Sequence, residues 1–182
     1  RNSVFMATNP VNGDIWATEM GRENLGDNTP PDEINIIQEG NDYGGPYCYG
    51  KNIRENTFRS GVDINCENKT LSHIDLQAHS APLGLDFVPE ENWPEDYWLD
   101  LIVAYHGSWN RTEPTGYKLM HFDLDDQGNL QKRSDFISGW LAQDDEKLGR
   151  PVDVEIFPEG IMLVSDDQRG VVYKIEYLRD GK

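Results

Sequence analysis

The feature that most constrains the fold is a recurring unit: a short apolar run, a Gly- or Pro-containing turn and a second apolar run, with almost no helical periodicity. This pattern is typical of antiparallel β structure. It predicts strands at residues 4–8, 14–18, 33–37, 83–88, 101–106, 117–124, 136–140, 152–157, 161–165 and 171–177. We therefore expect an all-β chain.

The strand pattern also repeats along the chain. Residues 9–19 resemble residues 157–166, since both read as a strand end, a turn, an apolar strand and an acidic residue, and a third copy with an insertion runs from 87 to 106. Such repetition suggests the blades of a β-propeller. About three blades fit in 182 residues, whereas propellers close with about 4–8. We therefore interpret residues 1–182 as one partial propeller domain.

Charge and hydropathy exclude several partners. The chain has 16 Lys and Arg against 33 Asp and Glu, a net charge of −17, which argues against nucleic acid and anionic membranes as partners. No run of about 18 apolar residues predicts a membrane span. Five Trp, eight Tyr and six Phe are too many for a disordered chain.

Residues 38–80 form a long polar connection with few strand signals, and this segment contains both cysteines, Cys48 and Cys66. We expect a disulfide that staples the loop, with two free thiols as the alternative. No second Cys or His pair stands at the spacing of a zinc site. A disulfide would imply folding in an oxidising place, such as the bacterial periplasm or outside the cell.

Two loops carry groups suited to ligands. Residues 19–33 are rich in carboxylates and amides on a Gly/Pro background, which fits either a Ca²⁺ site or a solvated acidic loop. Residues 41–50 are dense in Gly, Pro and Tyr, which fits either a flat surface for a planar ligand or a packed turn.

A third candidate follows the strand at 101–106. His106, Trp109, Asn110 and Arg111 stand together on a Gly-containing loop, where stacking and anion binding are both available. Ser108 lacks the Gly-x-Ser-x-Gly elbow of a serine hydrolase. Arg150 precedes another strand and is a candidate for an axial site. His79 also precedes a strand and is expected at the same end as His106, whereas His121 is interpreted as structural.

Together these segments resemble the soluble quinoprotein glucose/sorbosone dehydrogenase family, and most closely its sorbosone-dehydrogenase-like branch. The resemblance rests on residues 1–3, 16–22, 30–35, 42–50, 78–85, 106–111 and 149–152, which follow the family order over nearly the whole chain.

The resemblance implies a six-bladed β-propeller, of which this chain supplies roughly the C-terminal half. It further implies pyrroloquinoline quinone (PQQ) and Ca²⁺ as cofactors, an aldose as substrate and an external electron acceptor. The implied reaction oxidises the anomeric carbon to a lactone, with hydride transfer to PQQ. The implied location is periplasmic or secreted.

The resemblance also assigns roles to residues. Arg1 and Asn2 match a segment that contacts the quinone, and Arg150 matches an arginine that pairs with a cofactor carboxylate. Cofactor contacts are expected more loosely from His106, Trp109, Asn110 and Arg111. The backbone carbonyls of Gly21 and Arg22 match ligands of the cofactor calcium, and Glu33 and the Tyr43 carbonyl match ligands of a second calcium.

Two departures from the family pattern bear on activity. The family's general-base His lies upstream of the Arg-Asn segment, so no catalytic residue is assigned within this chain. Gly44-Gly45-Pro46 replaces the usual Gly-Trp-Pro and removes an aromatic packing element. Two other functions therefore stay open: a non-catalytic module that binds calcium and carbohydrate, and a calcium-dependent propeller hydrolase of the lactonase type.

Overall fold

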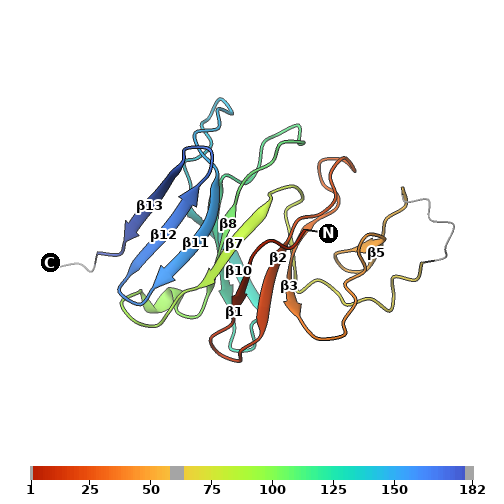
Figure 1. The fold of residues 1–182 in the computed structure, drawn as a ribbon, viewed down its shortest axis with the longest axis horizontal. Helices are drawn as coiled ribbons and strands as arrows, with labels where there is room; N and C mark the ends of the chain where they lie inside the picture. The colour runs from red at the N-terminus through yellow and green to blue at the C-terminus, as the bar shows by residue number, and fades with distance from the viewer. Residues whose placement is uncertain (1, 58–63, 179–182) are drawn as a thin grey trace.

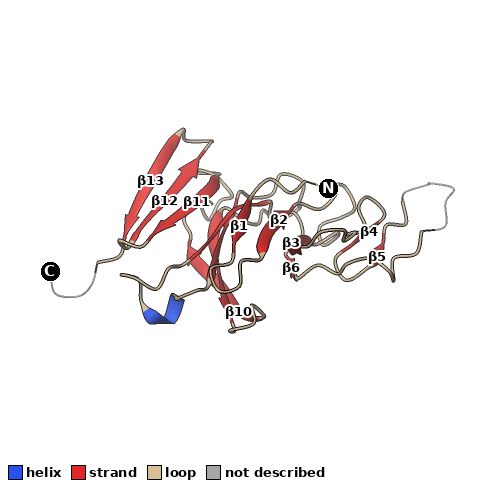
Figure 2. Ribbon diagram, turned by 60° about the horizontal axis from the view of Figure 1, so that its bottom comes forward, coloured by secondary structure: helices blue, strands red, loops and turns tan. Residues whose placement is uncertain are grey.

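The computed structural model describes residues 2–57 and 64–178, and its regular structure is almost entirely β (Figures 1 and 2). The strands are β1 (Met6–Thr8), β2 (Ile15–Glu19), β3 (Asp32–Ile37), β4 (Cys48–Tyr49), β5 (Ile53–Arg54), β6 (Ile74–Leu76), β7 (Pro82–Phe87), β8 (Leu101–Tyr105), β9 (Lys118–Leu124), β10 (Leu130–Ile137), β11 (Pro151–Phe157), β12 (Ile161–Asp166) and β13 (Val171–Glu176), with one short 3₁₀ helix, η1 (Glu95–Tyr97).

The strands form three antiparallel sheets that stand side by side, and a small separate hairpin. The first sheet has the order β1-β2-β3-β6, the middle sheet β10-β9-β8-β7 and the third sheet β11-β12-β13, while β4 pairs with β5. In Figure 1 the third sheet lies on the left, the first sheet on the right of the middle sheet, and the hairpin beyond it. Neighbouring strands are consecutive in the chain throughout the middle and third sheets, whereas in the first sheet β3 pairs with β6 across the hairpin β4–β5.

The strand β8 of the middle sheet is buried on both faces, which explains its continuous apolar sequence. All five residues of β8, Leu-Ile-Val-Ala-Tyr, are buried. Because side chains alternate along a strand, Leu101, Val103 and Tyr105 join the core against the first sheet. Ile102 and Ala104 join the core against the third sheet. One strand therefore links two hydrophobic cores.

The middle and third sheets approach closely at Gly84 in β7. A Cβ atom there would lie 2.5 Å from the Cα of Asp153 and 2.8 Å from the backbone nitrogen of Val154, so only glycine fits. Two residues along, Asp86 accepts a hydrogen bond from the backbone nitrogen of Ile156 at 2.7 Å. A carboxylate thus bridges the two sheets where their main chains meet.

The all-β expectation is confirmed, and most predicted strands lie within a residue or two of the observed ones. The three copies of the sequence repeat occupy equivalent places in the three sheets. Each copy covers the connection between the first two strands of its sheet and then the second strand, which is β2, β8 and β12 in turn. The prediction at 136–140 is displaced, because β10 runs over Leu130–Ile137. This outermost strand is mostly solvent-exposed and lacks an apolar alternation that would mark it.

The long connection from 38 to 80 holds three short strands that the sequence did not signal. Of these, β6 completes the first sheet by pairing with β3. Cys48 and Cys66 are joined by a disulfide, with their Cα atoms 5.8 Å apart, so the predicted bridge is present. Among the described residues, no helix is long and apolar enough to cross a membrane.

The Asp86 bridge generates a pH prediction. Burial raises the pKa of Asp86 to about 6, with Glu155 and Asp153 adding to the rise, while the hydrogen bonds from Ile156 and Phe87 oppose it. The unfolded-state value is about 4, so the folded protein binds the extra proton between these values. The stability that Asp86 contributes is therefore greatest below pH 4 and is lost as the pH rises through 6.

We expect the unfolding free energy of the wild type, minus that of Asp86→Asn, to fall by about 1–2 kcal/mol from pH 4 to pH 7. This magnitude is already reduced because Asp86 is partly exposed to solvent. Urea unfolding at several pH values measures it. Asp126→Asn, on an exposed turn, controls for the change in net charge. A difference that stays constant, or that grows with pH, contradicts the account.

Candidate functional site

Two neighbouring cavities lie where loops from the sheets meet, and both are lined by Gly21 and Glu23 of the β2–β3 loop. The smaller has a volume of about 170 Å³ and the larger of about 610 Å³. The smaller cavity extends from Gly21 toward the middle and third sheets. The larger lies between the first sheet and the disulfide-bonded loop.

The smaller cavity gathers residues from four distant segments. Its lining consists of Met20, Gly21, Glu23, Asp32, His79, Ala81, His106, Gly107, Trp109, Asn110 and Arg150. These come from the β2–β3 loop with the start of β3, the turn before β7, the loop after β8 and the residue before β11. The structure thus brings together Gly21, His106, Trp109, Asn110 and Arg150, which the sequence had singled out separately.

Arg150 is held in a defined position by neutral groups. Its Nη1 donates to the carbonyl of Gly107 at 2.9 Å, and Nη2 donates to the hydroxyl of Tyr117 at 3.1 Å. The guanidinium carbon lies 4.9 Å from the centre of the Tyr117 ring, within the range of a cation–π contact. In the described part of the chain, Arg150 forms no ion pair, so its charge stays available to an anionic ligand.

His106 is engaged through both ring nitrogens. Nε2 lies 3.0 Å from one carboxylate oxygen of Asp167 and 3.2 Å from the other. Nδ1 lies 3.3 Å from Nη1 of Arg150. Asp167 belongs to the turn between β12 and β13, so this contact joins the middle sheet to the third.

The residues after His106 divide between the cavity and its supporting wall. Trp109 is 67% exposed at the cavity, where its ring is open to a partner. The Nδ2 atom of Asn110 is buried and has no hydrogen-bond partner. Arg111, by contrast, is absent from the cavity lining and donates to the carbonyls of Asp27 and Ala78, with 3.2 Å to the latter. Arg111 therefore clamps neighbouring loops.

Asp32 supports the Gly21 loop from below. Its Oδ1 accepts from the backbone nitrogen of Gly21 at 2.8 Å, and its Oδ2 accepts from that of Ala81 at 3.0 Å. Burial raises the pKa of Asp32 to about 6 despite these hydrogen bonds. A single buried carboxyl thus ties two walls of the smaller cavity together.

His79 lies at the same cavity as His106, as the sequence predicted. Its Nε2 lies 2.8 Å from the carbonyl of Gly26 and 3.1 Å from that of Thr29, so this nitrogen carries a proton. The imidazole holds the β2–β3 loop over the cavity. His121 is structural, because it contacts the buried Asp100 at 2.6 Å away from both cavities.

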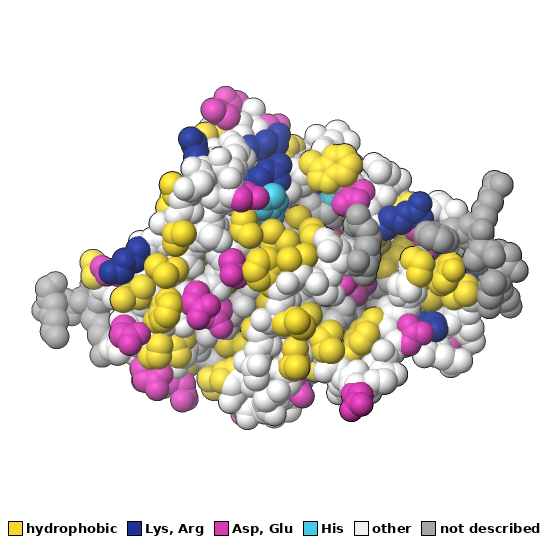
Figure 3. All heavy atoms as spheres, viewed as in Figure 1, with side chains coloured by type: hydrophobic (Ala, Val, Ile, Leu, Met, Phe, Trp, Pro, Cys, Tyr) yellow, Lys and Arg dark blue, Asp and Glu magenta, His cyan; other side chains and the backbone are white. Residues whose placement is uncertain are grey.

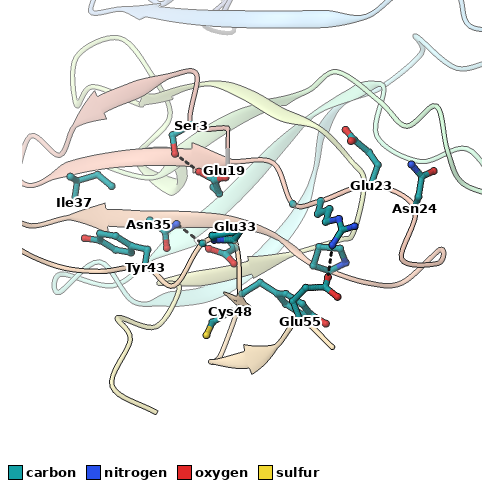
Figure 4. Close-up of a pocket in the computed structure, with 16 residues that line it drawn as sticks. Ser3, Glu19, Glu23, Asn24, Glu33, Asn35, Ile37, Tyr43, Cys48 and Glu55 are labelled. Atoms are coloured by element: carbon teal, nitrogen blue, oxygen red, sulfur yellow. Dashed lines mark hydrogen bonds and ion pairs between the residues drawn. The ribbon is translucent and has the colours of Figure 1, made fainter. Parts of the chain in front are cut away.

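The larger cavity is rich in oxygen atoms (Figure 4). Glu33 accepts hydrogen bonds from the backbone of Gly50 and from the Asn35 amide, the latter at 3.0 Å. Burial raises the pKa of Glu33, those hydrogen bonds lower it, and the nearby carboxylates Glu19 and Asp75 raise it further. The charged groups that shift the pKa of Glu33 are thus both carboxylates.

Two buried oxygens in this cavity have no hydrogen-bond donor: Oδ1 of Asn35 and Oε2 of Glu55. Oε2 of Glu55 faces the Arg22 guanidinium at 3.7 Å. Tyr43 also lines the cavity, and its hydroxyl donates to the Ile36 carbonyl at 2.6 Å. Glu33, Tyr43, Gly21 and Arg22 are therefore brought to one cavity.

The remaining predicted residues lie elsewhere. The backbone nitrogen of Asn2 donates to Glu19, and Asn2 lines neither cavity. Arg1 lies outside the described residues. No group of three or more His, Cys, Asp and Glu side chains in the described ranges is arranged to hold a metal ion.

Sequence reasoning missed Asn35, Glu55, Tyr117 and Asp167 as site residues, and it counted Asp32 only among the acidic residues of the candidate calcium loop at 19–33. Glu55 stands in a polar stretch between Arg54 and Asn56 with no periodicity to distinguish it. Asp167 lies next to Asp166 in a tight turn. The only sequence signal for Asp167 is the Asp-Asp pair at the end of the strand β12, which lies at the same end of the third sheet as Arg150.

Comparison with known proteins identifies the family. The TrAA12-like family model matches residues 1–178. The chain belongs to the TrAA12-like family. An uncharacterized protein from Borreliella burgdorferi is 39% identical over 180 residues, which cover 97% of this chain and 47% of that protein.

Solved structures share the fold of this TrAA12-like chain. A calcium structure of Trichoderma reesei Carbohydrate-Active Enzymes Family AA12 superposes with a TM-score of 0.77 and 23% identity, covering 96% of this chain and 51% of that one. The holo form of the pyranose dehydrogenase PQQ domain from Coprinopsis cinerea superposes with a TM-score of 0.69 and 21% identity, covering 97% of this chain and 54% of that one. The resemblance to the quinoprotein dehydrogenases is confirmed, and the chain spans about half the length of these relatives.

The β2–β3 loop carries the first site prediction. A Cβ at Gly21 would lie 2.7 Å from Cγ of Pro30 and 2.8 Å from the Pro31 carbonyl oxygen. Gly21→Ala must therefore displace the loop, at a cost of about 1–3 kcal/mol in unfolding free energy. We also expect faster amide hydrogen exchange over residues 20–24.

Gly26→Ala is the control, because it lies in the same loop but has only Thr29 Oγ1 at 3.9 Å within reach, although its positive φ adds some strain. Equal exchange over residues 20–24 in wild type and Gly21→Ala would contradict the close-approach argument.

Proposed function

We propose that this chain is part of a PQQ- and calcium-dependent oxidoreductase that oxidises an aldose at the anomeric carbon to a lactone. The observation that carries the proposal is the convergence of Gly21, His106, Trp109, Asn110 and Arg150 on one cavity. Relatives of the same fold support it, because one is named as a PQQ domain of a pyranose dehydrogenase and another as a calcium structure.

The side chains at the smaller cavity fit an anionic, planar cofactor. Arg150 offers a cation without an ion-pair partner in the described residues, which suits a carboxylate. The buried Nδ2 of Asn110 lacks an acceptor, and a bound carbonyl or carboxylate would supply one. Trp109 presents an exposed aromatic face on which a flat ring can stack.

The larger cavity fits Ca²⁺. Calcium takes 6–8 oxygen ligands from carboxylates, amides and carbonyls. Here Glu33 lies in the same cavity as Asn35 Oδ1 and Glu55 Oε2, two buried oxygens that accept no hydrogen bond. The raised pKa of Glu33 reflects burial and excess negative charge, which a cation would relieve. Glu33, the Tyr43 carbonyl and these oxygens would hold a structural ion, and the carbonyls of Gly21 and Arg22 the ion beside the cofactor.

When bound, PQQ supplies the redox chemistry by accepting a hydride, with Ca²⁺ acting as a Lewis acid. The residues of this chain bind and orient. Arg150 fixes the anionic edge of the ligand, Asp32 holds the Gly21 loop in place, and His79 fastens the same loop through Gly26 and Thr29. Both ring nitrogens of His106 are occupied, so His106 does not accept the substrate proton.

The rest of the protein completes this proposal. The two four-stranded sheets and the third sheet are three blades of a six-bladed propeller, and preceding residues supply the other blades and the general-base His. The disulfide favours a periplasmic or secreted location. The remaining partner in this proposal is an external electron acceptor.

The direct test titrates the full-length protein with PQQ in the presence of Ca²⁺. We expect saturable binding, a raised thermal midpoint and reduction of an artificial dye when an aldose is added. Arg150→Ala should weaken PQQ binding at least about tenfold, since it removes a charge-assisted contact. Arg133→Ala, which removes an equal charge from an exposed strand, should change it less than about twofold.

The other outcomes identify the alternatives. Binding of Ca²⁺ and sugar without PQQ would indicate a carbohydrate-binding module. Calcium-dependent lactone hydrolysis without PQQ binding would indicate a lactonase-type hydrolase. Either result would overturn the oxidoreductase proposal.

A further inference from the structure

Asp167 stands outside the functions described so far, because it does not line either cavity. Its carboxylate nevertheless reaches into the site through His106. The two contacts of 3.0 and 3.2 Å place both carboxylate oxygens on one imidazole nitrogen, Nε2. The residues are 61 positions apart in the chain, so the pairing depends on the packing of the third sheet against the middle one.

The contacts determine which nitrogen of His106 carries the proton. Arg150 has only N–H donors, so Nδ1 of His106 must offer its lone pair to Nη1. The proton of the neutral ring then resides on Nε2, where Asp167 accepts it. Only this tautomer satisfies both neighbours, and the alternative would direct an N–H group at the guanidinium.

The turn that carries Asp167 is itself fastened to Arg150. The preceding residue, Asp166, is buried and accepts from the backbone nitrogens of Arg150 at 3.0 Å and Arg169 at 2.9 Å. Its other oxygen accepts from the Tyr173 hydroxyl at 3.2 Å. Asp166 therefore holds the main chain of Arg150, and the adjacent Asp167 contacts its side chain through His106.

We propose that Asp167 is a positioning residue: by fixing the Nε2–H tautomer of His106, it orients the Arg150 guanidinium toward an anionic group of the ligand in the smaller cavity. The inference rests on the proposed function for the identity of that ligand, PQQ. In the space-filling view, Lys/Arg, His and Asp/Glu side chains gather on the upper part of the face shown (Figure 3).

The size of the effect follows from the other contacts of Arg150. Gly107 and Tyr117 still hold the guanidinium when the His106 contact is lost. Asp167 is exposed, and hydrogen-bonded charges at the surface contribute modestly. Loss of Asp167 should therefore weaken PQQ binding about three- to tenfold, less than loss of Arg150 itself.

The experiment uses full-length protein labelled with ¹⁵N-histidine, with Asp167→Ala, Asp167→Asn and Asp126→Ala as variants. Long-range ¹H–¹⁵N spectra report the tautomer of His106, whose signals are assigned with His106→Gln. PQQ affinity is measured by titration in the presence of Ca²⁺. Asp126→Ala removes the same charge from an exposed turn away from the cavities and controls for long-range electrostatics.

We expect wild type to show the Nε2–H tautomer and Asp167→Ala to show mixed tautomers with weaker PQQ binding. Asp167→Asn keeps an accepting oxygen, so it should retain the tautomer and bind within about twofold of wild type. An unchanged His106 spectrum in Asp167→Ala would overturn the proposal, as would unchanged PQQ affinity in a wild type that binds PQQ. If wild type does not bind PQQ, the proposed function fails, while the tautomer comparison still tests the contact.

Discussion

The burial of β8 on both faces of the middle sheet is the constraint on which the rest of the structure depends. β8 gives Leu101, Val103 and Tyr105 to one core and Ile102 and Ala104 to the other. A sheet held from both sides cannot slide by one residue without exchanging the two sets, since the side-chain period is two. The loop that follows β8 therefore leaves the sheet at a fixed point, and His106 begins that loop.

Rigid sheets with loops at their ends explain how the smaller cavity is assembled. The close approach at Gly84 sets the spacing of the middle and third sheets, which brings Arg150 and Asp167 within hydrogen-bonding reach of His106. The loops themselves have little regular structure and are fastened by side chains: Arg111, His79 and Asp32 each contact two different segments or residues. Precision at the cavity thus comes from the sheets, and local order from these polar contacts.

The sequence predicted those parts of the molecule that depend on local pattern. Inner strands are marked by alternation or by continuous apolar runs, and the cysteines by their place in a long loop. The predicted position of β10 was wrong because an outer strand has one exposed face and needs few apolar residues. Trp109 and Arg150 were found from their residue type at a strand end. Asp167 was missed because its partner is distant in sequence, and surface carboxylates are common in a chain of net charge −17. The sequence placed Asp32 in an acidic loop but did not predict its buried contacts with Gly21 and Ala81.

The start of β3 shows how one strand serves both cavities. Asp32 and Glu33 are consecutive, so their side chains point to opposite sides of the strand. Asp32 lines the smaller cavity and holds the Gly21 loop, while Glu33 lines the larger one with Asn35, two residues on and on the same side. The Gly21 loop borders both spaces. Two consecutive residues of β3 therefore contribute one carboxyl group to each cavity.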